Sequence, residues 1–249
     1  MKKHYLLFIL LTIFSVVGCS KKGETQENID PNTPDYPQNY KGYSDIKHKD
    51  FTFRVNNDIL LQYDADYSIN NLKKQIDTIY TLIKDSYIQK ICKHPIWVEI
   101  NTRPGGGGWY HISKQWLVDN GRNPDKAKCV EIANYRNFIA WHEQNQPFEL
   151  FHELIHLYHD QVLGLDYPPI IDAYNHAKNN KMYRDVSYHL KDDIYITKDV
   201  AYAMTNHHEY LTETSEAFFG GNDYFPFNKA QLKDYDPQMF QVLEDIWVK

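Results

Sequence analysis

The segment from Pro147 to Gly164 has the pattern of a helix that is buried along one side. Pro147 falls where the first turn of a helix tolerates proline, and Gly164 falls where helices commonly end. The apolar residues between them recur at alternating steps of three and four: Phe148, Phe151, Ile155, Tyr158 and Val162. We therefore expect one helix of about five turns whose apolar stripe packs against a core.

The same segment carries a metal-binding pattern beside its apolar stripe. His152 and His156 are four residues apart, so their side chains point the same way on a helix, and Glu153 lies next to them. This is the HExxH arrangement of zinc hydrolases, in which the two histidines bind Zn²⁺ and the glutamate acts as a base. The alternative is a pair of half-buried, hydrogen-bonded histidines, and the glutamate and the helix signals favour the metal site over it.

Catalytic zinc usually has three protein ligands and one open position, so a third ligand must come from elsewhere in the chain. The continuation HExxHxxGxxH is absent, because residue 159 is His and residue 162 is Val. Downstream, Glu209, Glu213 and Glu216 fall on one helical face at steps of four and three. Aligned carboxylates repel one another unless a cation compensates them, although a half-buried helix with an acidic edge would look the same. From the residues alone, the choice among the three glutamates stays open.

These motifs resemble those of the gluzincin peptidases of the anthrax lethal factor type, in which a second helix supplies the zinc glutamate. The shared pattern is HExxH at 152–156, then Tyr202, six residues, and Glu-x-x-x-Glu at 209–213. Asn222 to Phe227 also resembles the end of uncharacterised secreted HExxH proteins. The resemblance implies an α+β, zincin-like domain with a small mixed sheet. It implies these roles: zinc ligands His152, His156 and Glu209, general base Glu153, supporting carboxylate Glu213, and Tyr202 facing the substrate oxyanion.

Two departures from the lethal factor pattern keep the third ligand open. Leu211-Thr212 stands where that pattern has Phe-Ala, and His207-His208 stands where it has Glu-Ala. The tyrosine spacing favours Glu209. In a chain with 20 tyrosines, Tyr202 could equally be an ordinary packing residue. His159, His207 and His208 are reserve candidates for supporting or structural roles.

These residues predict a zinc-dependent metallopeptidase that acts on a peptide or protein substrate. Bound water of lowered pKa would attack the carbonyl, with Glu153 accepting its proton. A competing hypothesis is a non-catalytic cell-surface binding protein on a peptidase scaffold, serving nutrient uptake. A structural zinc protein is disfavoured because HExxH leaves an open position and keeps a base.

The amino-terminal residues predict export and a lipid anchor. Residues 1–19 have a basic start, an apolar run and the ending Val-Val-Gly-Cys, which resembles a bacterial lipoprotein signal peptide with lipidated Cys19. The run is short for a transmembrane anchor, which needs roughly 20 residues. We expect a flexible tether over residues 20–50 and the catalytic domain over residues 51–249, placed outside the cytoplasm and touching the membrane through the lipid alone.

Charge argues against nucleic acid as a partner. The formal net charge is −6, and it becomes −8 once the two lysines of the signal segment are removed. A chain that binds a phosphate backbone is usually basic.

Periodicity gives a coarse path through the domain. It predicts strands at 51–55, 96–100 and 129–133, a long helix over 68–90 with Ser68 as its N-cap, and a final core-packing helix from Asp236-Pro237. We expect residues 128–134 to be the sheet edge that pairs with substrate. The glycine run 105–108 lacks the features of a phosphate loop and predicts a surface loop, or one beside the substrate groove. Cys92 and Cys129 could form a disulfide, but two small buried side chains are the better expectation.

Overall fold

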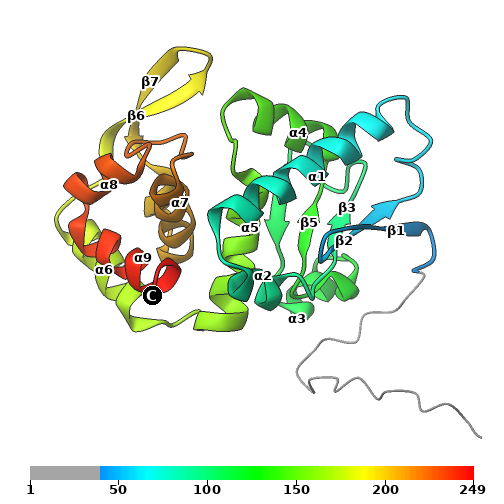
Figure 1. The fold of residues 1–249 in the computed structure, drawn as a ribbon, viewed down its shortest axis with the longest axis horizontal. Coiled ribbons are helices and arrows are strands. Elements are labelled where there is room, and N and C mark those ends of the chain that lie inside the picture. The colour runs from blue at the N-terminus through cyan, green and yellow to red at the C-terminus, as the bar shows by residue number, and fades with distance from the viewer. Residues whose placement is uncertain (1–39) are drawn as a thin grey trace, which may run out of the picture. The chain divides into compact units, whose positions relative to one another are not determined.

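A five-stranded mixed sheet forms one side of the domain in the computed structural model, which describes residues 40–249 (Figure 1). The strand order is β1-β2-β3-β5-β4. Strands β2, β3 and β5 run parallel, while β1 and β4 pair antiparallel at the two edges. The strands are β1 (Tyr43–His48), β2 (Phe51–Asn56), β3 (Ile96–Val98), β4 (Gly108–Tyr110) and β5 (Val130–Ile132). The expected α+β class with a small mixed sheet is confirmed.

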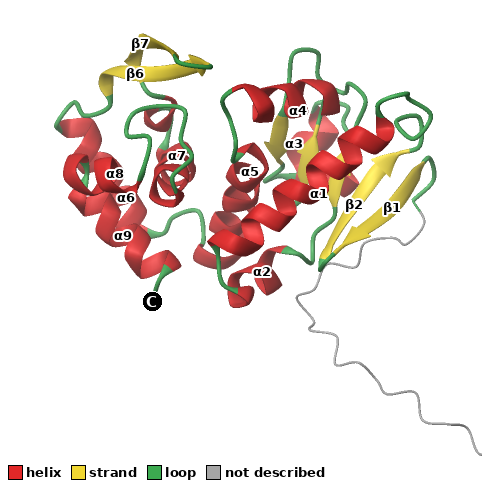
Figure 2. Ribbon diagram, turned by 45° about the horizontal axis from the view of Figure 1, so that its top comes forward, coloured by secondary structure: helices red, strands yellow, loops and turns green. Residues whose placement is uncertain are grey.

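Helix α5 (Glu149–Tyr158) stands between this sheet and a group of carboxy-terminal helices (Figure 1). It packs against β4 and β5 on one side and against α7 on the other. The remaining helices are α1 (Ala65–Leu82), α2 (Asp85–Ile91), α3 (Lys114–Asp119), α4 (Tyr135–Gln144), α6 (Pro168–Asn179), α7 (His207–Phe219), α8 (Lys229–Tyr235) and α9 (Pro237–Trp247). A two-stranded hairpin of β6 (Arg184–Lys191) and β7 (Ile194–Val200) lies beyond the carboxy-terminal helices (Figure 2).

The motif helix forms where the sequence places it, with one change at its end. After Tyr158 the chain continues through a π-helical turn, His159–Leu163, and stops at Gly164, whose φ of 85° suits a glycine. Phe151 and Ile155 are fully buried, so the predicted apolar stripe does face the core. The final helix, α9, is also confirmed, with Met239 and Leu243 in the core.

The helix expected over residues 68–90 is wrong in two respects. It begins at Ala65, and Ser68 lies buried inside it rather than capping it. It also ends at Leu82, because Ile83 and Lys84 adopt extended backbone before α2 starts at Asp85. The break lets Ile83 enter the core together with Ile88 of α2.

The folded domain begins earlier than residue 51. Strand β1 lies inside the segment expected to be a tether, and it pairs along its whole length with β2. Asp45 of β1 accepts two hydrogen bonds of 2.8 Å from the buried guanidinium of Arg54. The composition of a short polar segment does not predict a strand, because the residues that stabilise it lie on another strand. The predicted signal segment, with Cys19, and the rest of the tether up to residue 39 lie outside the described residues.

Two further expectations need correction. Residues 128–134 are not a sheet edge, because β5 is enclosed between β3 and β4, and β4 is the edge strand on that side. Helix α4 lies between β5 and the motif helix, at a place where the predicted path contains no helix. Cys92 and Cys129 are thiols rather than a disulfide, in line with the favoured expectation. Within residues 40–249, no helix is both long and apolar enough to cross a membrane.

Candidate metal centre

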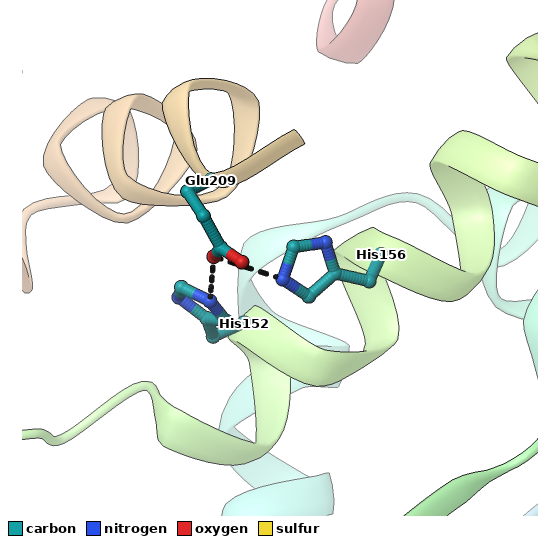
Figure 3. A group of neighbouring side chains, drawn as sticks. All are labelled: His152, His156 and Glu209. Atoms are coloured by element: carbon teal, nitrogen blue, oxygen red, sulfur yellow. Dashed lines mark hydrogen bonds and ion pairs between the residues drawn. The ribbon is translucent and has the colours of Figure 1, made fainter. Parts of the chain in front are cut away.

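Helices α5 and α7 bring two imidazoles and one carboxylate to a common point (Figure 3). The Nε2 atoms of His152 and His156 lie 3.2 Å and 3.1 Å from the same oxygen, Oε2 of Glu209. All three side chains are half-buried. The predicted pair on one helix and the predicted glutamate on a second helix are therefore together in space.

Local capping fixes the position of Glu209. Asn206 is the N-cap of α7, and its side-chain oxygen accepts hydrogen bonds from the backbone N–H groups of His208 and Glu209. The helix therefore starts just before Glu209 and directs this carboxylate at α5. Glu213, one turn further on, is carried deeper between the helices and is buried.

The donor set fits a metal ion. The ligand atoms of His152, His156 and Glu209 all lie within 4.8 Å of one another. Around a tetrahedral zinc with bonds of about 2.1 Å, neighbouring donor atoms are roughly 3.4 Å apart, close to the separations seen here. Two imidazole nitrogens and one carboxylate oxygen are also a donor combination of catalytic zinc sites, though they do not by themselves fix the ion's identity.

The pKa shifts of Glu209 and His152 come mainly from burial and from the contacts within this acidic and imidazole group. Burial alone would raise the pKa of Glu209, but hydrogen bonds and charges from His152 and His156 outweigh burial and hold it well below its usual range. Burial alone would lower the pKa of His152, but the charge of Glu216 and the hydrogen bonds that Glu209 and Glu216 accept from the imidazolium raise it well above its usual range. A metal ion would take the place of the protons between these atoms.

A second set of acidic groups contacts the other nitrogen of His152. Its Nδ1 lies 3.5 Å from Oε2 of Glu216 and 3.8 Å from Oε1 of Glu213. A ligating histidine commonly donates its other N–H to a carboxylate, which fixes the ring's orientation. The distances favour Glu216 for this role. The supporting role predicted for Glu213 stays a prediction.

Glu153 is buried next to the two histidines and lines the same cavity. Burial raises the pKa of its carboxyl, the charges of His156 and His152 lower it in part, and the net shift is upward. Raised proton affinity is what a general base needs in order to accept a proton from water near neutral pH.

The glycine run 105–108 has a packing reason that the sequence alone did not show. It lines the cavity and leads into β4. A Cβ atom on Gly108 would lie 2.7 Å from Cγ of Glu153, and one on Gly107 would lie 2.3 Å from Oε1 of Glu149. Only glycine lets the edge strand approach α5 this closely. The glycine run therefore lines a cavity instead of forming a plain surface loop, and its place beside a substrate groove stays a prediction.

Tyr202 lies at the cavity rim in the turn η3 (Tyr202–Met204) that precedes α7. Its ring centroid is 6.5 Å from that of His152, and 47% of the residue is exposed. Burial of part of the side chain and the charge of Glu209 raise its pKa to about 12, so the hydroxyl stays protonated and can donate a hydrogen bond. Its exposure argues against ordinary core packing.

The cavity has a volume of about 770 Å³ and extends well past the three candidate ligands. His208 lines it, whereas His159 and His207 do not. His159 and His208 approach each other through their Nδ1 atoms at 3.4 Å, and burial lowers their pKa values to about 3 and about 4. His159 and His208 are therefore neutral near pH 7, and the ring of His207 packs against that of His208.

Sequence reasoning missed a buried charge network under the sheet. The ammonium group of Lys126 lies 2.6 Å from Glu99 and 2.7 Å from Glu131, and Nε2 of His111 lies 2.5 Å from Glu131. A signal was present, because Glu99 and Glu131 each interrupt an otherwise apolar strand segment, Ile-Trp-Val-Glu-Ile and Cys-Val-Glu-Ile-Ala. A single carboxylate in a fully apolar strand needs a buried partner.

Comparison of the chain with protein-family models, curated proteins and solved structures finds no match. The arrangement of His152, His156 and Glu209 on two helices is therefore the ground on which a function can be argued.

Proposed function

We propose that this chain is a zinc-dependent metallopeptidase, held outside the cytoplasm by a lipid on Cys19. The observation that carries the proposal is the convergence of His152, His156 and Glu209 beside a buried glutamate in an open cavity. The HExxH spacing supplies Glu153 as the base, and the resemblance to gluzincins agrees with a glutamate on a second helix. A structural site would need neither the base nor the cavity.

Each side chain has a task in peptide hydrolysis. Zinc, when bound, supplies an activated water and polarises the carbonyl that this water attacks. Glu153 accepts the proton of that water and passes it to the leaving amine. Tyr202 donates its hydroxyl proton in a hydrogen bond to the carbonyl oxygen as negative charge develops there. Glu216 holds the ring of His152 by accepting its Nδ1–H.

The edge strand β4 gives the substrate a place to lie. It is the last strand on its side of the sheet, and its residues Gly108, Trp109 and Tyr110 line the cavity. An extended peptide can add to such an edge through main-chain hydrogen bonds. This replaces residues 128–134 as the proposed site of substrate pairing.

Zinc content is the first test. We expect elemental analysis of the purified full chain to give one zinc per molecule in the wild type and in Glu153→Gln, and loss or weakening of zinc in His156→Ala and Glu209→Ala. His176→Ala is the matched control, because His176 lies on an exposed face of α6. Folded wild-type protein that takes up no zinc when zinc is supplied would overturn the proposal.

Cleavage is the second test. A library of internally quenched peptides should be cleaved by the wild type, and Glu153→Gln should lose about two to four powers of ten in rate while retaining zinc. Equal cleavage by both proteins would remove Glu153 from the chemistry. Zinc binding without any cleavage would instead favour a binding protein built on a peptidase scaffold.

A further inference from the structure

One end of the cavity holds a group of carboxylates, and the proposed chemistry uses only one of them, Glu216. Glu149 of α5, Glu213 and Glu216 of α7, and Asp223 from the loop after α7 all line it. Each of the four is at most 8% exposed. Gln146 donates a hydrogen bond of 3.2 Å to Asp223, which holds this loop residue against the start of α5.

Two of these carboxylates do not have their full set of hydrogen bonds. Oε2 of Glu149 and Oε2 of Glu213 are buried, and neither has a hydrogen-bond partner among residues 40–249. A buried carboxylate oxygen without a donor is costly, because it has lost its water and gained nothing in return. Arg103 is the one lysine or arginine among the described residues that line the cavity, and its guanidinium stacks on Trp109 at 3.9 Å from the ring centroid.

A second metal ion is a poor explanation for this surplus of carboxylates. His152, Glu213 and Glu216 would offer it three ligand atoms, but the group shares His152 with the first site. A neutral imidazole has one nitrogen that accepts and one that carries a proton. If Nε2 binds the first metal, Nδ1 keeps its proton and donates to Glu216 rather than binding a second ion.

The walls of this end of the cavity suit an organic cation. Trp141, Tyr188 and Tyr224 line it together with the carboxylates. The rings of Tyr188 and Tyr224 pack with centroids 4.6 Å apart. Ammonium and guanidinium groups bind well between aromatic faces and carboxylates. The ring faces attract the positive charge, and the N–H groups stay available to donate hydrogen bonds to the carboxylates.

We infer that Glu149, Glu213 and Asp223 form a subsite for a cationic group of the substrate. The group is an ammonium or guanidinium, carried either by a lysine or arginine side chain beside the cleaved bond or by the free amino terminus of the peptide. Its N–H groups donate hydrogen bonds to Oε2 of Glu149 and Oε2 of Glu213. This inference rests on the proposed peptidase function and assigns it a substrate class.

Matched peptides test the subsite with the full, zinc-loaded chain. Quenched peptide mixtures carry lysine, norleucine or glutamate at one fixed position on either side of the scissile bond, with free or acetylated amino termini. Norleucine keeps the length of lysine and removes its charge. We expect lysine peptides, or free amino termini, to be preferred roughly tenfold to a hundredfold in kcat/KM.

Asp223→Asn should remove most of that preference, because it removes charge at the subsite without touching a metal ligand. The readout is the ratio of kcat/KM for the matched lysine and norleucine peptides, which a general loss of activity would leave unchanged. Asp172→Asn, an exposed change on α6, is the matched control and should behave as wild type.

The outcomes separate this inference from the proposed function. Cleavage that ignores the charge of the peptide would overturn the subsite and leave the peptidase standing. If no peptide is cleaved, calorimetric titration of zinc-loaded Glu153→Gln with the lysine and norleucine peptides still decides. Tighter binding of lysine that Asp223→Asn abolishes supports the subsite, and equal or absent binding overturns it. A second zinc per chain that Glu213→Gln removes would also overturn it.

Discussion

Two groups of buried carboxylates in this domain differ in what surrounds them. Under the sheet, Glu99 and Glu131 share the ammonium of Lys126, and Glu131 also accepts from His111 and Thr102. Between α5 and α7, the acidic groups beside His152 face mainly one another. The first group is closed by its own residues, whereas in the second one oxygen each of Glu149 and Glu213 has no hydrogen-bond partner within residues 40–249.

The proton affinities follow this difference. Burial would raise the pKa of Glu131, but the hydrogen bond from His111 and the charge of Lys126 lower it to about 2. Burial and, after it, the charge of Glu216 together raise the pKa of Asp223 to about 7. A buried charge whose partners are in place costs the fold little until a partner is removed, whereas a buried carboxylate without partners lowers stability and is a candidate for contact with a ligand.

Breaking the compensated network should have the largest effect. Lys126→Met leaves two buried carboxylates without their cation, so we expect the free energy of unfolding to fall by about 3–5 kcal/mol. Urea denaturation of zinc-free protein measures this. Lys49→Met, which breaks an exposed pair with Asp77, is the control and should cost at most about 1 kcal/mol. A loss from Lys126→Met no larger than the control's would show that the network is not structural.

The next effect concerns the carboxylate that orients His152. Glu216→Gln weakens the hydrogen bond from Nδ1, so zinc affinity should fall about tenfold to a hundredfold while the protein stays folded. Glu213→Gln, at 3.8 Å from the same atom, should reduce affinity less. Competition with a zinc chelator measures both, with exposed Glu143→Gln as control. The reverse order would return the orienting role to Glu213, as the family resemblance implies.

The sequence predicted the candidate metal ligands far better than their surroundings. His152 and His156 point the same way on any α-helix. The apolar stripe through Phe151 and Ile155 predicts that helix. Helical spacing also placed Glu209, Glu213 and Glu216 on one face, but only the spacing from Tyr202 and the family resemblance favoured Glu209, whose position the structure attributes to capping by Asn206. Periodicity therefore suffices wherever both partners of an interaction lie on one helix or at its cap.

Contacts between elements distant in the sequence could not be predicted. Strand β1 depends on the pairing of Asp45 with Arg54, and the place of β5 inside the sheet depends on β4 folding back beside it. The approach of Asp223 to Gln146 joins segments 77 residues apart. None of these leaves a periodic trace, so the sheet edge and the acidic subsite became visible only in three dimensions.

A smaller effect should appear as opposite pH dependences of stability in zinc-free protein. Asp223 has a folded-state pKa of about 7 against 3.8 ordinarily, so its contribution is present at low pH and is lost as pH rises between those values. Glu131 has a folded-state pKa of about 2 against 4.5, so its contribution is lost as pH falls through that range. Denaturation across pH should show both slopes, and Asp223→Asn should flatten the upper one by roughly 1–3 kcal/mol. An unchanged upper slope in this variant would contradict the assignment.

The smallest expected effect is a change in stability on replacing one buried glutamate by glutamine. Its sign should differ between the two groups of carboxylates, so it tests their comparison most directly. Burial and the charges of Asp223 and Glu216 raise the pKa of Glu213 well above its usual range, and its Oε2 has no hydrogen-bond partner among residues 40–249, so Glu213→Gln removes an acidic group whose charged form is unfavourable there. Zinc-free protein should therefore gain about 1 kcal/mol of stability, whereas Glu131→Gln should lose stability, since it breaks the contacts to His111 and Lys126. Urea denaturation near neutral pH compares the two variants directly. A loss of stability in both variants would make Glu213 a structural carboxylate like Glu131. A gain confined to Glu213→Gln, together with a weaker preference for lysine peptides, would show that the carboxyl of Glu213 lowers stability in the free protein and serves substrate binding.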